Sequence, residues 1–227
     1  MDTLQLAIFD LDGVIVDTAK YHYLAWKRLA EELGFHFSEK DNERLKGVSR
    51  MRSLEILLEV GGLEKSEEEK ALLADKKNTW YVEYILNMDK TEILPGVLAF
   101  LRELKEHNVK IALGSASKNA RTILDRLEIT PFFDVIVDGN LVSKAKPDPE
   151  VFVLGAKVLD IPPQTCVVFE DAQAGIEAAL QAGMKVIGVG DANLLRHAHH
   201  VIPGFASFDL EQLLRVLDTR VPGPINL

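Results

Sequence analysis

The stretch that decides the fold is AIFDLDGVIVDT, residues 7–18. It opens with apolar residues typical of a buried strand and then carries two acids, Asp10 and Asp12, at the end of that strand. Two carboxylates this close together repel each other unless a positive charge lies between them. The stretch therefore predicts a buried strand that ends at a charged site, for which the rest of the chain must supply cations.

The composition excludes several classes of function. The chain has 227 residues, of which 47% are hydrophobic, so it can form a sizeable core. The formal net charge of -9 argues against nucleic-acid or membrane-surface binding, because both partners require an excess of Lys and Arg. The single cysteine, Cys166, lies in an apolar run, which favours burial over a role as nucleophile. With no visible signal peptide or membrane-length apolar run, we expect a cytoplasmic protein.

Short apolar runs alternate with helical patterns along most of the chain. This alternation predicts an α/β fold with a parallel, Rossmann-like sheet and crossover helices. The predicted strands cover residues 6–9, 109–113, 135–137, 167–169 and 186–189. Helices are predicted at residues 95–107 and 119–127, after an N-cap at Asp148, and after a capping box formed by Asp209 and Gln212.

Residues 17–88 break the alternation, since they contain helical patterns and no convincing strand. A capping box at Ser66–Glu69 opens a long helix within this segment. We therefore expect an all-helical cap domain, residues 17–88, inserted into an α/β core domain made of residues 1–16 and 89–227. An insertion directly after the first strand would lie over the ligand-binding edge of the sheet, which makes it a candidate lid.

Three further polar clusters are present. Two of them, at residues 114–119 and 170–171, directly follow predicted strands, and the third, at residues 144–148, precedes a predicted helix. In a parallel sheet these segments share one edge with the first strand. Carboxylates there provide the oxygen ligands that Mg²⁺ prefers, and a hydroxyl-rich loop that opens a helix can hold phosphate oxygens. A lysine would neutralise the remaining charge; Lys144 and Lys146 are both candidates, and Pro147 favours Lys146.

Each of these features alone has an ordinary structural interpretation, and only their joint order supports a site. Trp26 fits packing between helices better than a substrate contact, His22 could be a packing histidine on the same helical stripe, and Arg50 could cap a helix. The three histidines at 197, 199 and 200 lack a carboxylate or cysteine at metal-ligand spacing, so we expect a solvated loop there.

Taken in order, Asp10–Val14, Ser115, Lys146–Pro147 and Glu170–Asp171 resemble the four motifs of the haloacid dehalogenase superfamily of phosphotransferases, over nearly the whole chain. The resemblance implies that Asp10 is the nucleophile that becomes an aspartyl phosphate and that Asp12 is the general acid and base. It also implies a Mg²⁺ site, formed by the side chains of Asp10, Glu170 and Asp171 and the backbone carbonyl of Asp12. Gly114 stands where the superfamily commonly has alanine, and we expect that difference to be harmless.

A finer resemblance, to sugar-phosphate mutases within that superfamily, is carried by residues 17–22, 25–27, 43–50, 77–78 and 115–119. These mutases interconvert β-glucose 1-phosphate and glucose 6-phosphate through β-glucose 1,6-bisphosphate. The resemblance implies that Ser115 and Lys146 hold the transferred phosphoryl group. The other residues that it implies for substrate binding are Thr18, His22, Trp26, Gly47, Val48, Ser49, Arg50, Lys77, Ala116, Ser117, Lys118 and Asn119, with Arg50, Ser117 and Asn119 on the second phosphate.

Two other functions remain open at this point. A sugar-phosphate phosphatase of the same superfamily would share all four motifs, but it would not need a second phosphate site such as Arg50 and Lys77 provide. A non-catalytic sugar-phosphate sensor would not need the acid and base at Asp12. We expect small sugar phosphates as the partners, no nucleic acid or membrane, and a monomer.

Overall fold

The computed structural model describes residues 4–45 and 48–218, so Gly47 of the predicted site and the C-terminal tail lie outside the described residues. The chain divides into two compact units. The core unit comprises Met1–Asp17 and Lys90–Leu227, and the helical unit comprises Thr18–Asp89. The helical insertion expected from the sequence, residues 17–88, begins and ends one residue earlier than this helical unit. No helix in the described ranges has the length and apolar character needed to cross a membrane.

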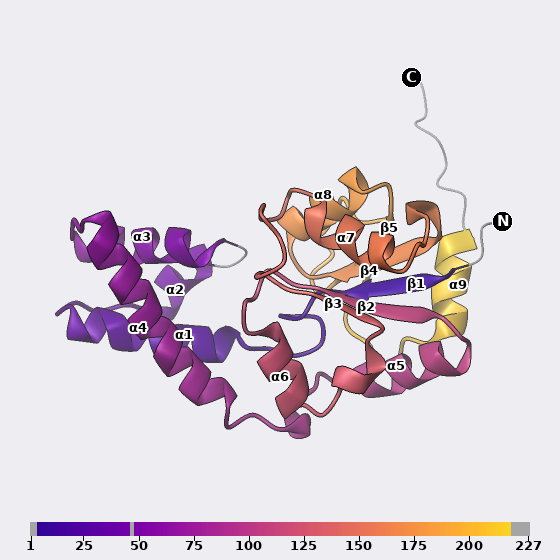
Figure 1. Ribbon diagram of the computed structural model, residues 1–227, viewed down its shortest axis with the longest axis horizontal. Coiled ribbons are helices and arrows are strands. Elements are labelled where there is room, and N and C mark those ends of the chain that lie inside the picture. The colour runs from indigo at the N-terminus through magenta and orange to yellow at the C-terminus, as the bar shows by residue number, and fades with distance from the viewer. Residues whose placement is uncertain (1–3, 46–47, 219–227) are drawn as a thin grey trace, which may run out of the picture. The chain divides into compact units, whose positions relative to one another are not determined.

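The core unit contains a six-stranded sheet in the order β3-β2-β1-β4-β5-β6, with every neighbouring pair parallel (Figure 1). The predicted α/β fold with a parallel sheet is therefore confirmed. The strand order reverses between β1 and β4, and ligands of open α/β sheets bind at such a switch point. The strands are β1 (Leu6–Phe9), β2 (Lys110–Gly114), β3 (Val135–Val137), β4 (Cys166–Glu170), β5 (Lys185–Val189) and β6 (His200–Ile202).

The strand register places the predicted acids side by side. Phe9, the last residue of β1, pairs with Leu113 of β2 and with Phe169 of β4. The next residue in each chain segment is Asp10, Gly114 and Glu170, respectively. Because parallel strands run in the same direction, these three positions meet at one edge of the sheet, at the switch point.

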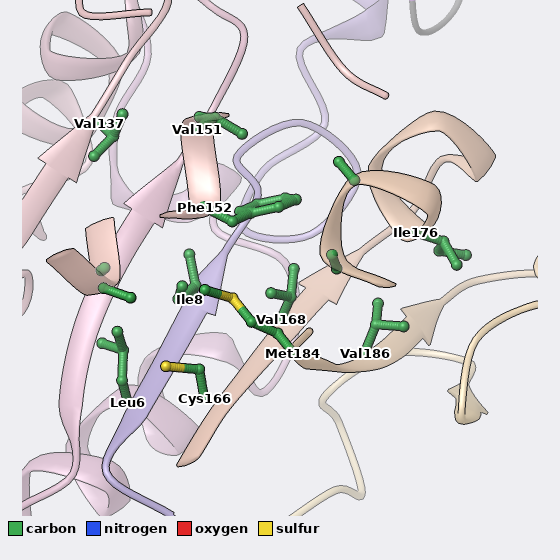
Figure 2. Packing of buried hydrophobic residues seen from close by; sticks show 14 of the residues in the cluster. Leu6, Ile8, Val137, Val151, Phe152, Cys166, Val168, Ile176, Met184 and Val186 are labelled. Atoms are coloured by element: carbon green, nitrogen blue, oxygen red, sulfur yellow. The ribbon is translucent and has the colours of Figure 1, made fainter. Parts of the chain in front are cut away.

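Helices cover both faces of this sheet (Figure 1). On one face, α7 (Glu150–Val158) and α8 (Gln173–Gln181) pack on strand residues such as Ile8 and Val168 (Figure 2). On the other face, Phe9 stacks on Phe169, and both contact Phe100 of α5. The remaining helices of the unit are α5 (Val97–Glu106), α6 (Ala120–Arg126) and α9 (Leu210–Asp218), with 3₁₀ turns at Lys90–Glu92, Thr130–Phe132 and Pro163–Thr165.

The described structure corrects two sequence expectations in the core unit. Of the three histidines expected in a solvated loop, His197 and His199 lie in an exposed loop as predicted, whereas His200 begins the short strand β6. The His199 ring also accepts a hydrogen bond from the Val186 backbone N–H at 3.1 Å. A three-residue strand is too short to show alternation in the sequence. Helix α7 begins one position later than predicted, with Pro149 in the N-cap position, although the Asp148 side chain still accepts the Glu150 N–H.

The helical unit consists of α1, α2, α3, α4 and one 3₁₀ turn, and its described residues contain no strand. This confirms the predicted all-helical insertion. Ser66 and Glu69 form both hydrogen bonds of the predicted capping box, and they fix the start of α4. Trp26 and Leu29 of α1 are buried in the unit, as their helical spacing indicates. The elements are α1 (Ala19–Glu32), α2 (Glu39–Asn42), the turn Glu43–Leu45, α3 (Arg50–Gly61) and α4 (Glu67–Ile85).

Candidate active site

The two N-terminal acids lie on a tight loop that leaves β1. The Asp10 N–H donates to the Phe169 carbonyl at 2.9 Å, which continues the β1–β4 pairing by one residue. The chain then turns at Gly13, whose φ of 76° favours glycine, and the Gly13 N–H donates to the Val16 carbonyl. Apolar residues Val14–Val16 are buried beneath this turn. The loop thus holds Asp10 buried and Asp12 half-buried at the edge of the sheet.

Three carboxylates converge at this edge, with one oxygen each from Asp10, Glu170 and Asp171 lying within 4.8 Å of one another. Lost hydration, and then repulsion from Asp10 and Asp12, raise the pKa of Asp171 to about 7, although its residue surface is exposed. Burial, opposed by Lys146 and reinforced by repulsion from Asp10, raises the pKa of Glu170 above its ordinary range. Such crowding of acids fits a divalent cation, which would relieve the repulsion.

Lys146 supplies positive charge to the same cluster. Its ammonium lies 2.6 Å from Asp10 Oδ1 and 3.0 Å from Glu170 Oε2, and 4.8 Å from the centre of the Phe152 ring. Burial alone lowers the pKa of Lys146, but the charges of Asp10 and Glu170 outweigh that effect and raise it, so the lysine is charged. Lys144 instead pairs with Asp148 at the surface. The structure therefore places Lys146, and not Lys144, beside the acids of the cluster.

The hydroxyl-rich loop after β2 has a shape that its own side chains fix. The Ser115 Oγ accepts the Ser117 N–H at 3.1 Å, and the Ser117 Oγ accepts the Asn119 N–H at 3.2 Å. Ser115 is buried beside the end of β2, whereas Ala116 and Lys118 are exposed. This loop places hydroxyl and backbone groups at the sheet edge that carries Asp10.

The sequence did not reveal that residues after β3 support this loop. The Gly139 N–H donates to the Ser117 carbonyl, and the Asn140 side chain donates to the Lys118 carbonyl at 2.9 Å. A Cβ atom at Gly139 would lie 2.3 Å from the Ala116 carbonyl oxygen. The dipeptide Gly139-Asn140 after β3 was the available signal, because it is typical of a turn.

Gly114, which stands where the superfamily commonly has alanine, could not be replaced by alanine in this chain without a rearrangement. A Cβ atom there would come within 2.7 Å of the Phe152 ring, which also carries the Lys146 ammonium on its face. An alanine at this position would require the ring to move. Phe152 had no distinguishing sequence signal, because it lies in an ordinary apolar helix pattern.

Within the helical unit, Lys77 of α4 and His22 of α1 form a second buried polar cluster. The Lys77 ammonium donates to His22 Nδ1 at 2.8 Å and lies 4.5 Å from the Trp26 ring centre and 4.7 Å from that of Tyr81. The His22 ring stacks on Tyr81 with centres 4.0 Å apart. Since an ammonium only donates, Nδ1 must accept, so the neutral His22 ring carries its proton on Nε2. Trp26 thus both packs in the unit and contacts a predicted binding residue.

Arg50 belongs to the same electrostatic neighbourhood. Burial, followed by the charges of Lys77 and Arg50, keeps the pKa of His22 well below its ordinary value. Arg50 itself is half-buried at the first turn of α3, and burial lowers the pKa of its guanidinium. The structure therefore gathers His22, Lys77 and Arg50 in one region of the helical unit.

The other predicted residues of this unit have mainly local contacts. The Ser49 Oγ caps α3 by accepting the Arg52 N–H at 3.3 Å, and Val48 is exposed. Thr18 is buried and begins α1, where its carbonyl accepts the N–H groups of Tyr21 and His22. The residue that caps α3 is thus Ser49 and not Arg50.

Comparisons with known proteins identify the family of this chain. The profile of the haloacid dehalogenase-like hydrolase family matches residues 7–189. The chain belongs to this family. It is 44% identical to the β-phosphoglucomutase of Bacillus subtilis over 212 residues, which cover 92% of this chain and 94% of the relative. It is 34% identical to a phosphorylated carbohydrates phosphatase of Thermotoga maritima, over 81% of this chain and 84% of the relative.

Solved structures of the family have the same architecture. The crystal structure of a β-phosphoglucomutase from Clostridium difficile matches with a TM-score of 0.89 and 43% identity, over 95% of this chain and 97% of that one. The family match extends across both Asp10 and Asp171 and so includes all four motifs. The predicted superfamily and fold class are thereby confirmed, and the chain is an enzyme of this haloacid dehalogenase-like family.

Proposed function

We propose that this protein interconverts β-D-glucose 1-phosphate and D-glucose 6-phosphate, the β-phosphoglucomutase reaction, through β-glucose 1,6-bisphosphate. The observation that carries the proposal is the presence of two separate cationic clusters. Lys146 accompanies the acids of the core unit, and Arg50 with Lys77 forms the cluster of the helical unit. A mutase has to hold two phosphates, whereas a phosphatase needs to hold only one. The Bacillus subtilis and Clostridium difficile relatives support the same reaction.

The proposed chemistry assigns one role to each N-terminal acid. An Asp10 carboxylate oxygen attacks the phosphorus of the bisphosphate in line, and the bond from phosphorus to the sugar oxygen breaks. Asp12 donates a proton to that leaving oxygen, and in the second half-reaction it removes the proton from the hydroxyl that takes the phosphoryl group back. Lys146 and Ser115 neutralise and hold the phosphoryl group during the transfer. The aspartyl phosphate on Asp10 makes the enzyme a phosphoprotein.

We propose Mg²⁺ as the metal of this site. The side chains of Asp10, Glu170 and Asp171, whose oxygens lie within 4.8 Å of one another, would hold it together with the backbone carbonyl of Asp12. Oxygen donors of this kind are those that Mg²⁺ prefers. When bound, the ion supplies electrostatic stabilisation of the charge on the transferred phosphoryl group.

The second phosphate is assigned to Arg50 with Ser117 and Asn119. A guanidinium can pair with a phosphate through two parallel hydrogen bonds, which gives orientation as well as affinity. We further assign Thr18, His22, Lys77 and Trp26, and the loop residues Gly47, Val48 and Ser49, to binding and orienting the sugar phosphate. Ala116 and Lys118 complete the loop around the phosphoryl group.

A single assay separates the proposed function from its rivals. The purified protein is supplied with Mg²⁺, β-glucose 1-phosphate and a catalytic amount of β-glucose 1,6-bisphosphate, and both glucose 6-phosphate and free phosphate are followed. We expect glucose 6-phosphate to form much faster than phosphate is released. Release of phosphate without isomerisation would instead identify a phosphatase, the reaction for which the Thermotoga maritima relative is named. Binding without either product would identify a sensor.

We also propose that the enzyme acts as a monomer in the cytoplasm. The single cysteine, which is buried and cannot form a disulfide within the chain, supports a reducing compartment, and the proposed sugar-phosphate reaction places the enzyme in carbohydrate metabolism. Light scattering coupled to size-exclusion chromatography should give a mass near 25.3 kDa. A mass of twice that value would contradict the monomer.

A further inference from the structure

Helix α8 comes unusually close to one of the metal-site acids at Gly175. A Cβ atom built on Gly175 would lie 2.0 Å from the Glu170 carboxyl carbon and 2.1 Å from its Oε1. Non-bonded carbon atoms normally stay about 3.5–4.0 Å apart. Glu170 therefore occupies the volume that any other residue at position 175 would fill with its side chain.

The Glu170 side chain has little freedom to give way. It is buried, with 1% of its surface exposed, and Lys146 holds its Oε2 at 3.0 Å. Its Oε1 faces α8, and its Cγ would also lie only 2.4 Å from the added Cβ. A substitution at Gly175 would thus rotate the whole carboxyl group away from Asp10 and Asp171, rather than displace only its outer atom.

Gly13 has the same relation to the neighbouring acid. A Cβ atom there would lie 2.1 Å from Asp171 Oδ2. Gly13 also has a φ of 76°, so a substitution would strain the backbone whatever its neighbours. Gly175 has no such left-handed conformation, which makes its effect on Glu170 separable from backbone strain.

We propose that Gly175 is a positioning residue of the metal site, which allows the Glu170 carboxylate to lie between α8 and Lys146 in the orientation that faces Asp10 and Asp171. The inference rests on the proposed metal function of these acids. Helix α8 would then both pack on the sheet and border the metal site, because position 175 in its first turn has no side chain and leaves room for the Glu170 carboxylate.

The test is Gly175→Ala, for which two interpretations give opposite expectations. Alanine favours a helix over glycine, so a purely helical role for Gly175 predicts a higher melting temperature and unchanged metal binding. The positioning role predicts that Mg²⁺ affinity, measured by calorimetric titration of metal-free protein with MgCl₂, falls by about 10- to 100-fold, as for other residues that orient metal ligands. Circular dichroism should show that the variant remains folded.

Gly155→Ala in α7 is the matched control. It is also a buried helix glycine, but its added Cβ would meet Ala112 and Val137 at 3.8 Å, an ordinary contact. This variant should bind Mg²⁺ as the wild type does and should melt at the same or a higher temperature. An equal loss of affinity in both variants would overturn the assignment to Gly175, as would wild-type affinity in Gly175→Ala.

A second pair of variants keeps the inference testable if Gly175→Ala does not fold, or if the wild type binds no Mg²⁺. Glu170→Ala removes the carboxylate that the new methyl group would meet. In that background Gly175→Ala should fold and melt at the same temperature as Glu170→Ala or a higher one, because the added methyl group no longer meets a carboxylate. If the double variant melts well below Glu170→Ala, or also fails to fold, Glu170 is not the group that Gly175 accommodates. Absent Mg²⁺ binding by the wild type, by contrast, would count against the proposed metal function and not against the positioning role.

Discussion

Lys146 in the core unit and Lys77 in the helical unit are both buried, but different chemistry holds their ammonium groups. Lys146 contacts two carboxylates, at 2.6 Å from Asp10 and 3.0 Å from Glu170. Lys77 donates to the neutral His22 ring and lies over the faces of Trp26 and Tyr81, with 2% of its surface exposed. One lysine is part of an ion cluster, and the other is set among aromatic rings.

The difference bears on what each lysine can do. A carboxylate neutralises the cation that it pairs with, so Lys146 belongs to a charge balance that also involves the proposed metal and the phosphoryl group. An aromatic face orients and stabilises a cation without removing its charge. The contacts of Lys77 with Trp26 and Tyr81 therefore hold the ammonium in place without themselves neutralising it.

The largest effect is expected from the acid that anchors the core cluster. Asp10→Asn should abolish turnover, because an amide cannot form the aspartyl phosphate, while the circular dichroism spectrum stays unchanged. Asp134→Asn is a suitable control, since Asp134 pairs with Lys105 and Lys110 away from the sheet edge and should affect stability only. More than trace activity in pure Asp10→Asn would rule out Asp10 as the nucleophile.

Asp12→Ala should slow both phosphoryl transfers by about 10²- to 10⁴-fold, the usual loss when a general acid and base is removed. Mg²⁺ affinity should change much less, because the Asp12 side chain does not join the carboxylate cluster found among the described residues. Single-turnover kinetics and calorimetric metal titration measure the two quantities separately. A collapse of metal binding would make the Asp12 side chain a ligand and would contradict its assigned role.

The two lysines themselves give the most direct test of the comparison. Lys146→Met leaves buried carboxylates without their partner, and breaking a buried pair in this way typically costs about 3–5 kcal/mol of unfolding free energy. Lys77→Met keeps an apolar chain against the rings and loses the cation–aromatic contacts, about 2 kcal/mol, and the hydrogen bond to His22, about 1 kcal/mol. Urea denaturation without metal should show this difference. Added Mg²⁺ should restore part of the loss in Lys146→Met and none of it in Lys77→Met; equal recovery would refute the distinction.

Arg50→Ala tests whether the cations of the helical unit act on substrate. Losing a charge-assisted contact with the second phosphate should weaken binding of the sugar phosphates by about 1.5–3 kcal/mol. Acetyl phosphate has no second phosphate, so its reaction with Asp10 should be affected much less. Arg52→Ala is the control, because Arg52 lies on the same helix and pairs with Glu55 and Glu59 at the surface. Equal losses with both phosphoryl donors would leave Arg50 a structural residue.

The smallest effect concerns the pH dependence of stability in the helical unit. The pKa of His22 is depressed in the folded protein, so below about pH 6.5 the unfolded chain binds a proton that the folded chain does not. Stability should then fall by at most about 1.4 kcal/mol per pH unit as the pH drops from 6.5. His22→Asn keeps an acceptor for Lys77 but does not titrate, and it should flatten this part of the profile. An unchanged slope would show that His22 is protonated in the folded state.

The sequence alone located those polar residues that directly follow a regular apolar run. Asp10, Ser115 and Glu170 each stand within one residue of the end of a strand, so a local apolar run located them without knowledge of the fold. Strand β6 was missed because three residues cannot show alternation, and the choice between Lys144 and Lys146 depended on which ammonium reaches Asp10. That distance joins residues that are far apart in the chain, and no local pattern encodes it.

The sequence by itself thus determined the α/β class, the helical insertion, the family and the acids at the strand ends, because strands, caps and motifs are written in neighbouring residues. Only the tertiary structure decided how these groups are held. It set Lys77 between Trp26 and Tyr81, Lys146 on the Phe152 ring, and Gly175 against Glu170. The physical reason is that close packing depends on the volume between elements that meet only after folding. A glycine that leaves such a volume to a neighbouring side chain looks in sequence like any other glycine.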